Sequence, residues 1–245
     1  MKVVSDICYS ERSGQLLDIY LPDADVFPVF LYFHGGGLTG GDKTNTKVFL
    51  NYLASHGIAA VSANYRLYPN ASYPDFLRDA AEAAAWVKRH MGEYGKVTDL
   101  YIGGSSAGGY ISQMLCFDRK WLGEYGLNPM DFAGFVHDAG QPTCHFNVLK
   151  ERGLDSRRVI VDEYSPLFYV GADETYPAML IIVSDNDMEN RYEQTLLLNA
   201  TLKHFGHSDN VHLTVMNGKH CAYIGMVDED GMSVFGKLIE AFIND

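Results

Sequence analysis

The chain has 245 residues, of which 47% are hydrophobic and 20% charged, and this length and composition suit one large globular domain over residues 1–245. Acidic residues outnumber basic ones by 31 to 19, and the net charge of −12 argues against nucleic acid and anionic membranes as partners. The sequence has no run of about 18 apolar residues and no apolar core of a signal peptide, so we expect a cytoplasmic protein.

The predicted elements begin with an antiparallel hairpin, because extended segments at 3–9 and 15–21 flank a turn at Ser13-Gly14. Short apolar runs then alternate with helical patterns. Strands are predicted at 26–33, 58–62, 99–102, 132–137, 178–183 and 211–216, and helices at 47–56, 75–91, 189–205 and 232–243. This alternation predicts an α/β fold with a mostly parallel central sheet of about eight strands and helices on both faces.

One long segment, residues 138–177, has no clear periodic pattern. It follows a strand at the end of the sheet where α/β proteins bind their ligands. It can fold over that site as a small cap, or it can be a surface loop with short helices, and the sequence leaves both open.

The glycine-rich stretch YIGGSSAGGY, residues 101–110, is compatible with a phosphate-binding loop or with a turn that presents a nucleophile. The dinucleotide pattern G-x-G-x-x-G fails because a serine takes the place of its middle glycine, and the Walker pattern fails because Gly109 stands where the lysine must be. The pattern G-x-S-x-G fits completely as Gly104-Ser105-Ser106-Ala107-Gly108. Ser106 is therefore the predicted nucleophile.

A second motif, His34-Gly35-Gly36-Gly37, directly follows the strand predicted at 26–33. Three consecutive glycines leave backbone amides free to approach a developing negative charge. We expect an oxyanion hole formed by the N–H groups of Gly36, Gly37 and Ala107, with His34 bracing the loop rather than acting as a base.

A reactive serine also needs a histidine that takes its proton and a carboxylate that orients the histidine. The strand predicted at 178–183 runs into Asp185 and Asp187, and we favour Asp187 because it lies beyond the strand end, where the chain can turn back. Among nine histidines, His220 follows the last strand and faces the same sheet edge. The chain order Ser106, Asp187, His220 is that of an α/β-hydrolase.

With these motifs in place, the chain resembles the α/β-hydrolase serine esterases of the hormone-sensitive-lipase-like branch and, by its small size, the bacterial feruloyl and acetyl-xylan esterases. The matching residues are His34-Gly-Gly-Gly-Leu-Thr-Gly-Gly-Asp-Lys43, Asn64-Tyr-Arg-Leu67, Pro74, Asp79, the 104–108 motif, Ser165-Pro-Leu167, Asp187 and His220. The resemblance implies the α/β-hydrolase fold.

The chain departs from this family at two places. Leu38 follows the glycines where many relatives carry an aromatic residue, so a different acyl pocket is expected. Fewer than thirty residues precede the strand before His34, which leaves no room for the helical N-terminal cap of the lipase-like members. We therefore expect a thinly covered site that favours small or extended esters.

The expected function is that of a carboxylesterase that cleaves small or aromatic acyl esters, possibly linked to carbohydrate, with a small-molecule ester as its partner and with neither metal nor organic cofactor. An amidase, an arylformamidase or a small peptidase would use the same triad, so these stay open. A non-catalytic binding protein of the same fold is the alternative from another class. The sequence gives no prediction of oligomeric state.

Overall fold

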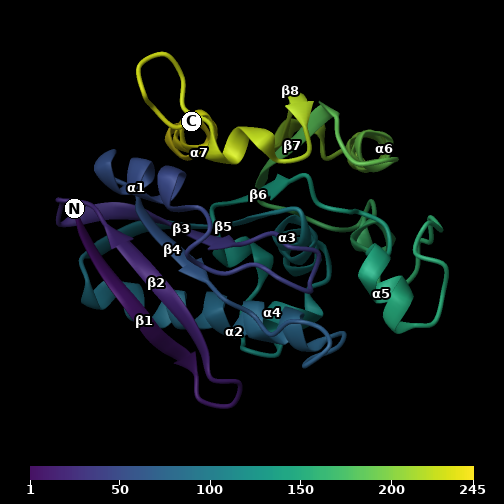
Figure 1. Cartoon of the computed structure of the whole chain (residues 1–245), viewed down its shortest axis with the longest axis horizontal. Coiled ribbons are helices and arrows are strands. Elements are labelled where there is room, and N and C mark those ends of the chain that lie inside the picture. The colour runs from purple at the N-terminus through teal and green to yellow at the C-terminus, as the bar shows by residue number, and fades with distance from the viewer.

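The computed structural model describes residues 1–245 and contains one sheet of eight strands in the order β1-β2-β4-β3-β5-β6-β7-β8 (Figure 1). The strands are β1 (Lys2–Ser10), β2 (Gln15–Leu21), β3 (Val26–Phe33), β4 (Ala59–Ala63), β5 (Lys96–Ser105), β6 (Gly134–Asp138), β7 (Ala178–Asn186) and β8 (Val211–Lys219). Strand β2 is antiparallel to both of its neighbours, and the other adjacent pairs are parallel. The predicted hairpin and mostly parallel sheet are confirmed.

Seven α-helices connect and cover the strands: α1 (Lys47–Ser55), α2 (Asp75–His90), α3 (Ala107–Phe117), α4 (Lys120–Gly123), α5 (Phe146–Glu151), α6 (Arg191–His204) and α7 (Val234–Asn244). Short 3₁₀ turns lie at Met91–Glu93, Pro129–Asp131, Pro166–Tyr169, Ser208–Asn210 and Ala222–Gly225. None of the helices combines the length and the apolar character that crossing a bilayer would take.

The helices cover both faces of the sheet, as predicted. In Figure 1, α1 and α7 lie on one side, and α2 and α3 lie on the other. Side chains of β3 alternate between the two apolar clusters that result: Leu31 and Phe33 pack with residues of α2 and α3, whereas Phe30 and Tyr32 pack with residues of α1 and α7.

All predicted strands and helices are present, with shifted ends. Helix α3 has no counterpart among the predicted ranges, because all eleven of its residues are buried and it therefore lacks the one-sided periodicity that marks an amphipathic helix. The 138–177 segment contains α5 and the 3₁₀ turn Pro166–Tyr169. In Figure 1, α5 lies near one end of the sheet, outside both helical layers.

Candidate active site

Ser106 lies between the end of β5 and the start of α3 with a strained backbone, φ 56° and ψ −111°. A residue with a side chain adopts such angles at a cost of about 1–3 kcal/mol, and only where the surroundings impose them. Here the Ser106 N–H donates to the Asp138 carbonyl at 2.8 Å, and the Ser106 carbonyl accepts from the Tyr110 N–H at 2.9 Å. Strand β6 and the first turn of α3 therefore hold the serine in this conformation.

The motif glycines beside Ser106 are needed for close packing rather than for a left-handed backbone, because neither Gly104 nor Gly108 has a positive φ. A Cβ on Gly108 would lie 1.9 Å from the Phe33 carbonyl oxygen, and one on Gly104 would lie 2.3 Å from the Gly108 carbonyl oxygen. Their hydrogen atoms let α3 start directly against the end of β3.

His220 connects Ser106 to a carboxylate. Its Nε2 lies 2.8 Å from Ser106 Oγ, and its Nδ1 lies 2.5 Å from Asp187 Oδ1. His220 follows the end of β8, and Asp187 follows the end of β7. The structure thus places Asp187 against the histidine, whereas Asp185 accepts a hydrogen bond at 2.9 Å from the Gly218 N–H and so holds the turn before His220.

The Asp187 side chain is fully buried, yet it stays ionised. Burial alone would raise the pKa of this carboxyl, but hydrogen bonds from His220 and from the N–H groups of Met188 and Ser184 outweigh burial and hold the pKa below its usual range. A carboxylate in this position fixes the ring of His220 with a proton on Nδ1 and leaves Nε2 free to accept the Ser106 proton.

The glycine loop after β3 lies beside Ser106, with Gly35, Gly36 and Gly37 lining the same cavity. Gly36 and Gly37 have φ of 121° and 64°, and neither N–H donates to another protein group. Ala107 is the first residue of α3, so its N–H has no acceptor within the helix. The three predicted oxyanion donors are therefore unpaired.

His34 lies behind this loop rather than in the site. Its ring stacks on Tyr65 with centroids 4.4 Å apart, and Tyr65 Oη donates to the His34 carbonyl at 2.7 Å. Burial lowers the pKa of His34, so the ring is neutral at physiological pH. These contacts agree with the expected bracing role.

A cavity of about 330 Å³ opens at Ser106 and His220. Phe146, Met188 and Ile224 give it apolar walls, and the glycine loop forms another side. Leu38 is fully buried in the core and does not line the cavity, so its own side chain does not form part of the acyl pocket.

Two side chains of α5 contact the site without any signal in the sequence. Phe146 lines the cavity, and Asn147 Nδ2 donates to the Gly37 carbonyl. The helix is only six residues long and lies within the segment that lacks a periodic pattern. No local pattern could have placed these residues beside the glycine loop.

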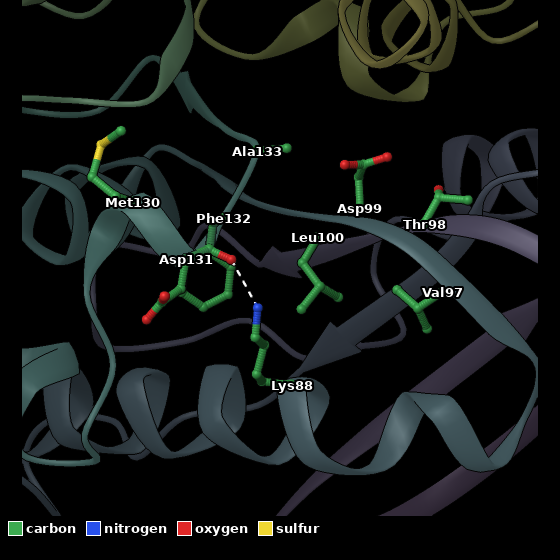
Figure 2. Close-up of a pocket in the computed structure, with 9 residues that line it drawn as sticks. All are labelled: Lys88, Val97, Thr98, Asp99, Leu100, Met130, Asp131, Phe132 and Ala133. Atoms are coloured by element: carbon green, nitrogen blue, oxygen red, sulfur yellow. Dashed lines mark hydrogen bonds between the residues drawn. The ribbon is translucent and has the colours of Figure 1, made fainter.

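Another hollow, of about 420 Å³, lies where β5 begins, at the end of the strand away from Ser106. Figure 2 shows Lys88 beneath it, with Nζ donating to the Asp131 carbonyl at 3.0 Å. No serine, cysteine or histidine lines it, so it holds no Ser–His or Cys–His pair. The cavity at Ser106 is the better candidate for catalysis.

Solved structures with the same fold come from bacterial esterases. Esterase B from Lactobacillus rhamnosis superposes with a TM-score of 0.81 at 17% identity, covering 99% of this chain and 85% of that one. Esterase Est2 from Thermogutta terrifontis, with butyrate bound, superposes with a TM-score of 0.78 at 21% identity, covering 98% and 92%. At these identities the likeness establishes the α/β-hydrolase fold.

Curated relatives match shorter stretches. The probable carboxylic ester hydrolase LipM of Mycobacterium tuberculosis is 39% identical over 116 residues, which are 44% of this chain and 27% of the relative. The probable carboxylesterase 7 of Arabidopsis thaliana is 31% identical over 136 residues, or 48% and 43%. The matches thus cover between about a quarter and a half of the relatives' lengths.

The family described as BD-FAE matches residues 17–202 of the chain. The matched region contains the glycine loop, Ser106 and Asp187 and ends before His220. It spans well over half of the sequence, so the chain belongs to the BD-FAE family and, as its motifs predict, to the α/β-hydrolase serine esterases.

Proposed function

We propose that the protein hydrolyses carboxylic esters through an acyl-enzyme formed on Ser106. The observation that carries this proposal is the unbroken hydrogen-bond chain from Ser106 Oγ through His220 to the buried Asp187, beside three unpaired backbone donors. The esterase names of the relatives support the choice of an ester as substrate.

In the first half of the reaction, Ser106 Oγ attacks the ester carbonyl carbon while His220 Nε2 takes its proton. The N–H groups of Gly36, Gly37 and Ala107 stabilise the oxyanion that forms. The tetrahedral intermediate collapses, the bond from the carbonyl carbon to the alkoxy oxygen breaks, and His220 returns the proton to the departing alcohol.

In the second half, water attacks the acyl-enzyme and gives its proton to His220, which passes that proton to Ser106 Oγ as the carboxylic acid leaves. Asp187 remains a carboxylate throughout and stabilises the charged ring of His220 in both halves. Every proton in this scheme moves between Ser106, His220, water and the substrate.

The cavity suits a small substrate. Its volume of about 330 Å³ is at the lower end of ligand pockets, which span roughly 300–1,000 Å³. We propose acyl groups of short or single-ring size, bound against Phe146, Met188 and Ile224.

The test is hydrolysis of p-nitrophenyl butyrate by a Ser106→Ala protein, for which we expect kcat to fall by about 10³-fold or more. Ser105→Ala is the matched control, because Ser105 is the adjacent serine and makes no hydrogen bond to His220. A fluorophosphonate should label wild-type protein once, at Ser106. Wild-type turnover by the Ser106→Ala protein would disprove the proposal.

A further inference from the structure

A second cavity, of about 240 Å³, adjoins the one at Ser106. Phe146 and Met188 line both cavities, so they form the wall between them. The 138–177 segment contributes Gln141 and residues 156–158, and the start of α6 contributes the other side. A substrate that extends past the wall from Ser106 would enter this second cavity.

The second cavity is rich in positive charge, although the chain as a whole carries a net charge of −12. Three arginines line it against a single acidic residue, Glu189. Arg157 is neutralised locally by a bidentate pair with Asp155, at 2.7 Å between the closest atoms. Arg158 is exposed and makes no ion pair. Arg158 therefore has a free guanidinium at the cavity.

Arg191, the third arginine, is 3% exposed, and no carboxylate oxygen lies within 4.0 Å of its side-chain nitrogens. Its guanidinium donates to the Ala139 carbonyl and, at 3.3 Å, to Gln141 Oε1. The nearby carboxylate of Asp187 is already bonded to His220. Burial lowers the pKa of Arg191, as expected for a cation that lacks a counterion.

The position of Arg191 adds to the free-energy cost of burying its charge. It is the first residue of α6, where the helix dipole disfavours a positive charge and favours a negative one. A bound anion would pair with the guanidinium of Arg191 and would also be stabilised by the helix end. Arg158, in the 138–177 segment, and Arg191 with the start of α6 thus favour the same kind of ligand from two separate parts of the chain.

We propose that the second cavity binds a carboxylate carried by the ester substrate, so that the preferred esters are anionic. This inference rests on the proposed esterase function. The planar guanidinium group of arginine pairs with a carboxylate through two parallel hydrogen bonds, which the ammonium group of lysine cannot do. The cavity has three arginines and no lysine. The neutral side chains of Gln141, Ser156, Asn190 and Gln194 complete the polar lining.

The test compares each carboxylate ester with its carboxamide, which has the same shape without the charge. For a carboxylate on the acyl side, the pair is mono-p-nitrophenyl adipate and its amide. For a carboxylate on the alcohol side, the pair is 3-(4-acetoxyphenyl)propanoate and its amide. We expect kcat/KM to be about tenfold higher for the carboxylate than for the amide in one of the two pairs, which is the effect of one charge-assisted hydrogen bond. The pair that shows this difference tells whether the second cavity receives the acyl side or the alcohol side of the ester.

Arg158→Glu should reverse that preference, because it replaces the free guanidinium with a negative charge. Arg89→Gln, an exposed arginine on α2, is the control and should retain the wild-type ratio. A ratio near one in both pairs, unchanged by Arg158→Glu, overturns the inference while the neutral esters still support the proposed function. If neither ester is cleaved, binding of 3-(4-hydroxyphenyl)propanoate to the wild type and to Arg158→Glu decides the inference separately, and equal affinities overturn it.

Discussion

The Asp187 carboxylate can only accept a hydrogen bond from His220 Nδ1–H, which fixes the tautomer, and its negative charge stabilises the ring when it becomes charged. We therefore expect Asp187→Asn to lower kcat for p-nitrophenyl butyrate by about 10³–10⁴-fold, because the amide favours the wrong tautomer. KM should change little. Asp185→Asn is the matched control, since Asp185 bonds only the Gly218 N–H. Equal losses in the two variants would contradict the role given to Asp187.

The site residues that the sequence predicts best are those that belong to a local motif, in which adjacent residues restrict the backbone. Ser106 and the glycine loop stand out because a sharp strand-to-helix turn and a run of free amides require glycines at fixed spacing. Asp185 and Asp187 could be ranked only by their distance from the strand end. Their contacts, with Gly218 and His220 respectively, depend on how the ends of β7 and β8 lie together.

At the scale of elements, α5 supports the glycine loop from outside the sheet. Asn147 is 8% exposed and donates to the Gly37 carbonyl, and the adjacent Phe146 lines the cavity. We propose that the 138–177 segment acts as a small cap. Sequence reasoning left its role open because tertiary contacts, not periodicity, determine where α5 lies.

Loss of the Asn147 side chain removes its hydrogen bond to the Gly37 carbonyl and should let the glycine loop of the oxyanion hole move. We expect Asn147→Ala to lower kcat about tenfold or more, because small displacements of a donor weaken transition-state binding. Asn210→Ala is a suitable control, since Asn210 makes the same kind of bond, at 3.2 Å, to the Tyr176 carbonyl far along the chain from the glycine loop. Steady-state kinetics on p-nitrophenyl butyrate would reveal the difference. Unchanged kcat in Asn147→Ala would argue against the supporting role.

At the scale of the whole molecule, buried titratable groups make stability depend on pH. Burial lowers the pKa of His34, lowers that of His137 to about 3 and lowers that of His145 well below its usual value. Below a pH of about 6.5 the unfolded chain therefore binds protons on these three histidines more readily than the folded chain does. Burial also raises the pKa of Asp138 to about 7, so between pH 4 and 7, roughly, the folded state retains one proton that the unfolded chain has lost.

The three histidines outweigh the one proton of Asp138, so we expect the free energy of unfolding to fall as the pH is lowered from about 6 to 5, by about 1.4 kcal/mol per pH unit for each net proton that unfolding takes up. Urea unfolding at several pH values would measure this slope. His137→Gln should reduce the slope by about 1.4 kcal/mol per pH unit, which corresponds to one proton. A free energy of unfolding that stays flat from pH 7.5 to 5 would refute the prediction.

The strained backbone of Ser106 has a consequence for evolution. Its cost of about 1–3 kcal/mol is a sizeable part of the 5–15 kcal/mol, roughly, that keeps a protein folded. Glycine would relieve this cost, because it adopts φ near 56° freely. Selection for stability thus favours glycine at position 106, and only selection for turnover retains serine. Relatives that have lost the histidine at position 220 should therefore carry glycine at position 106 more often than relatives that keep it, which an alignment of the family can check.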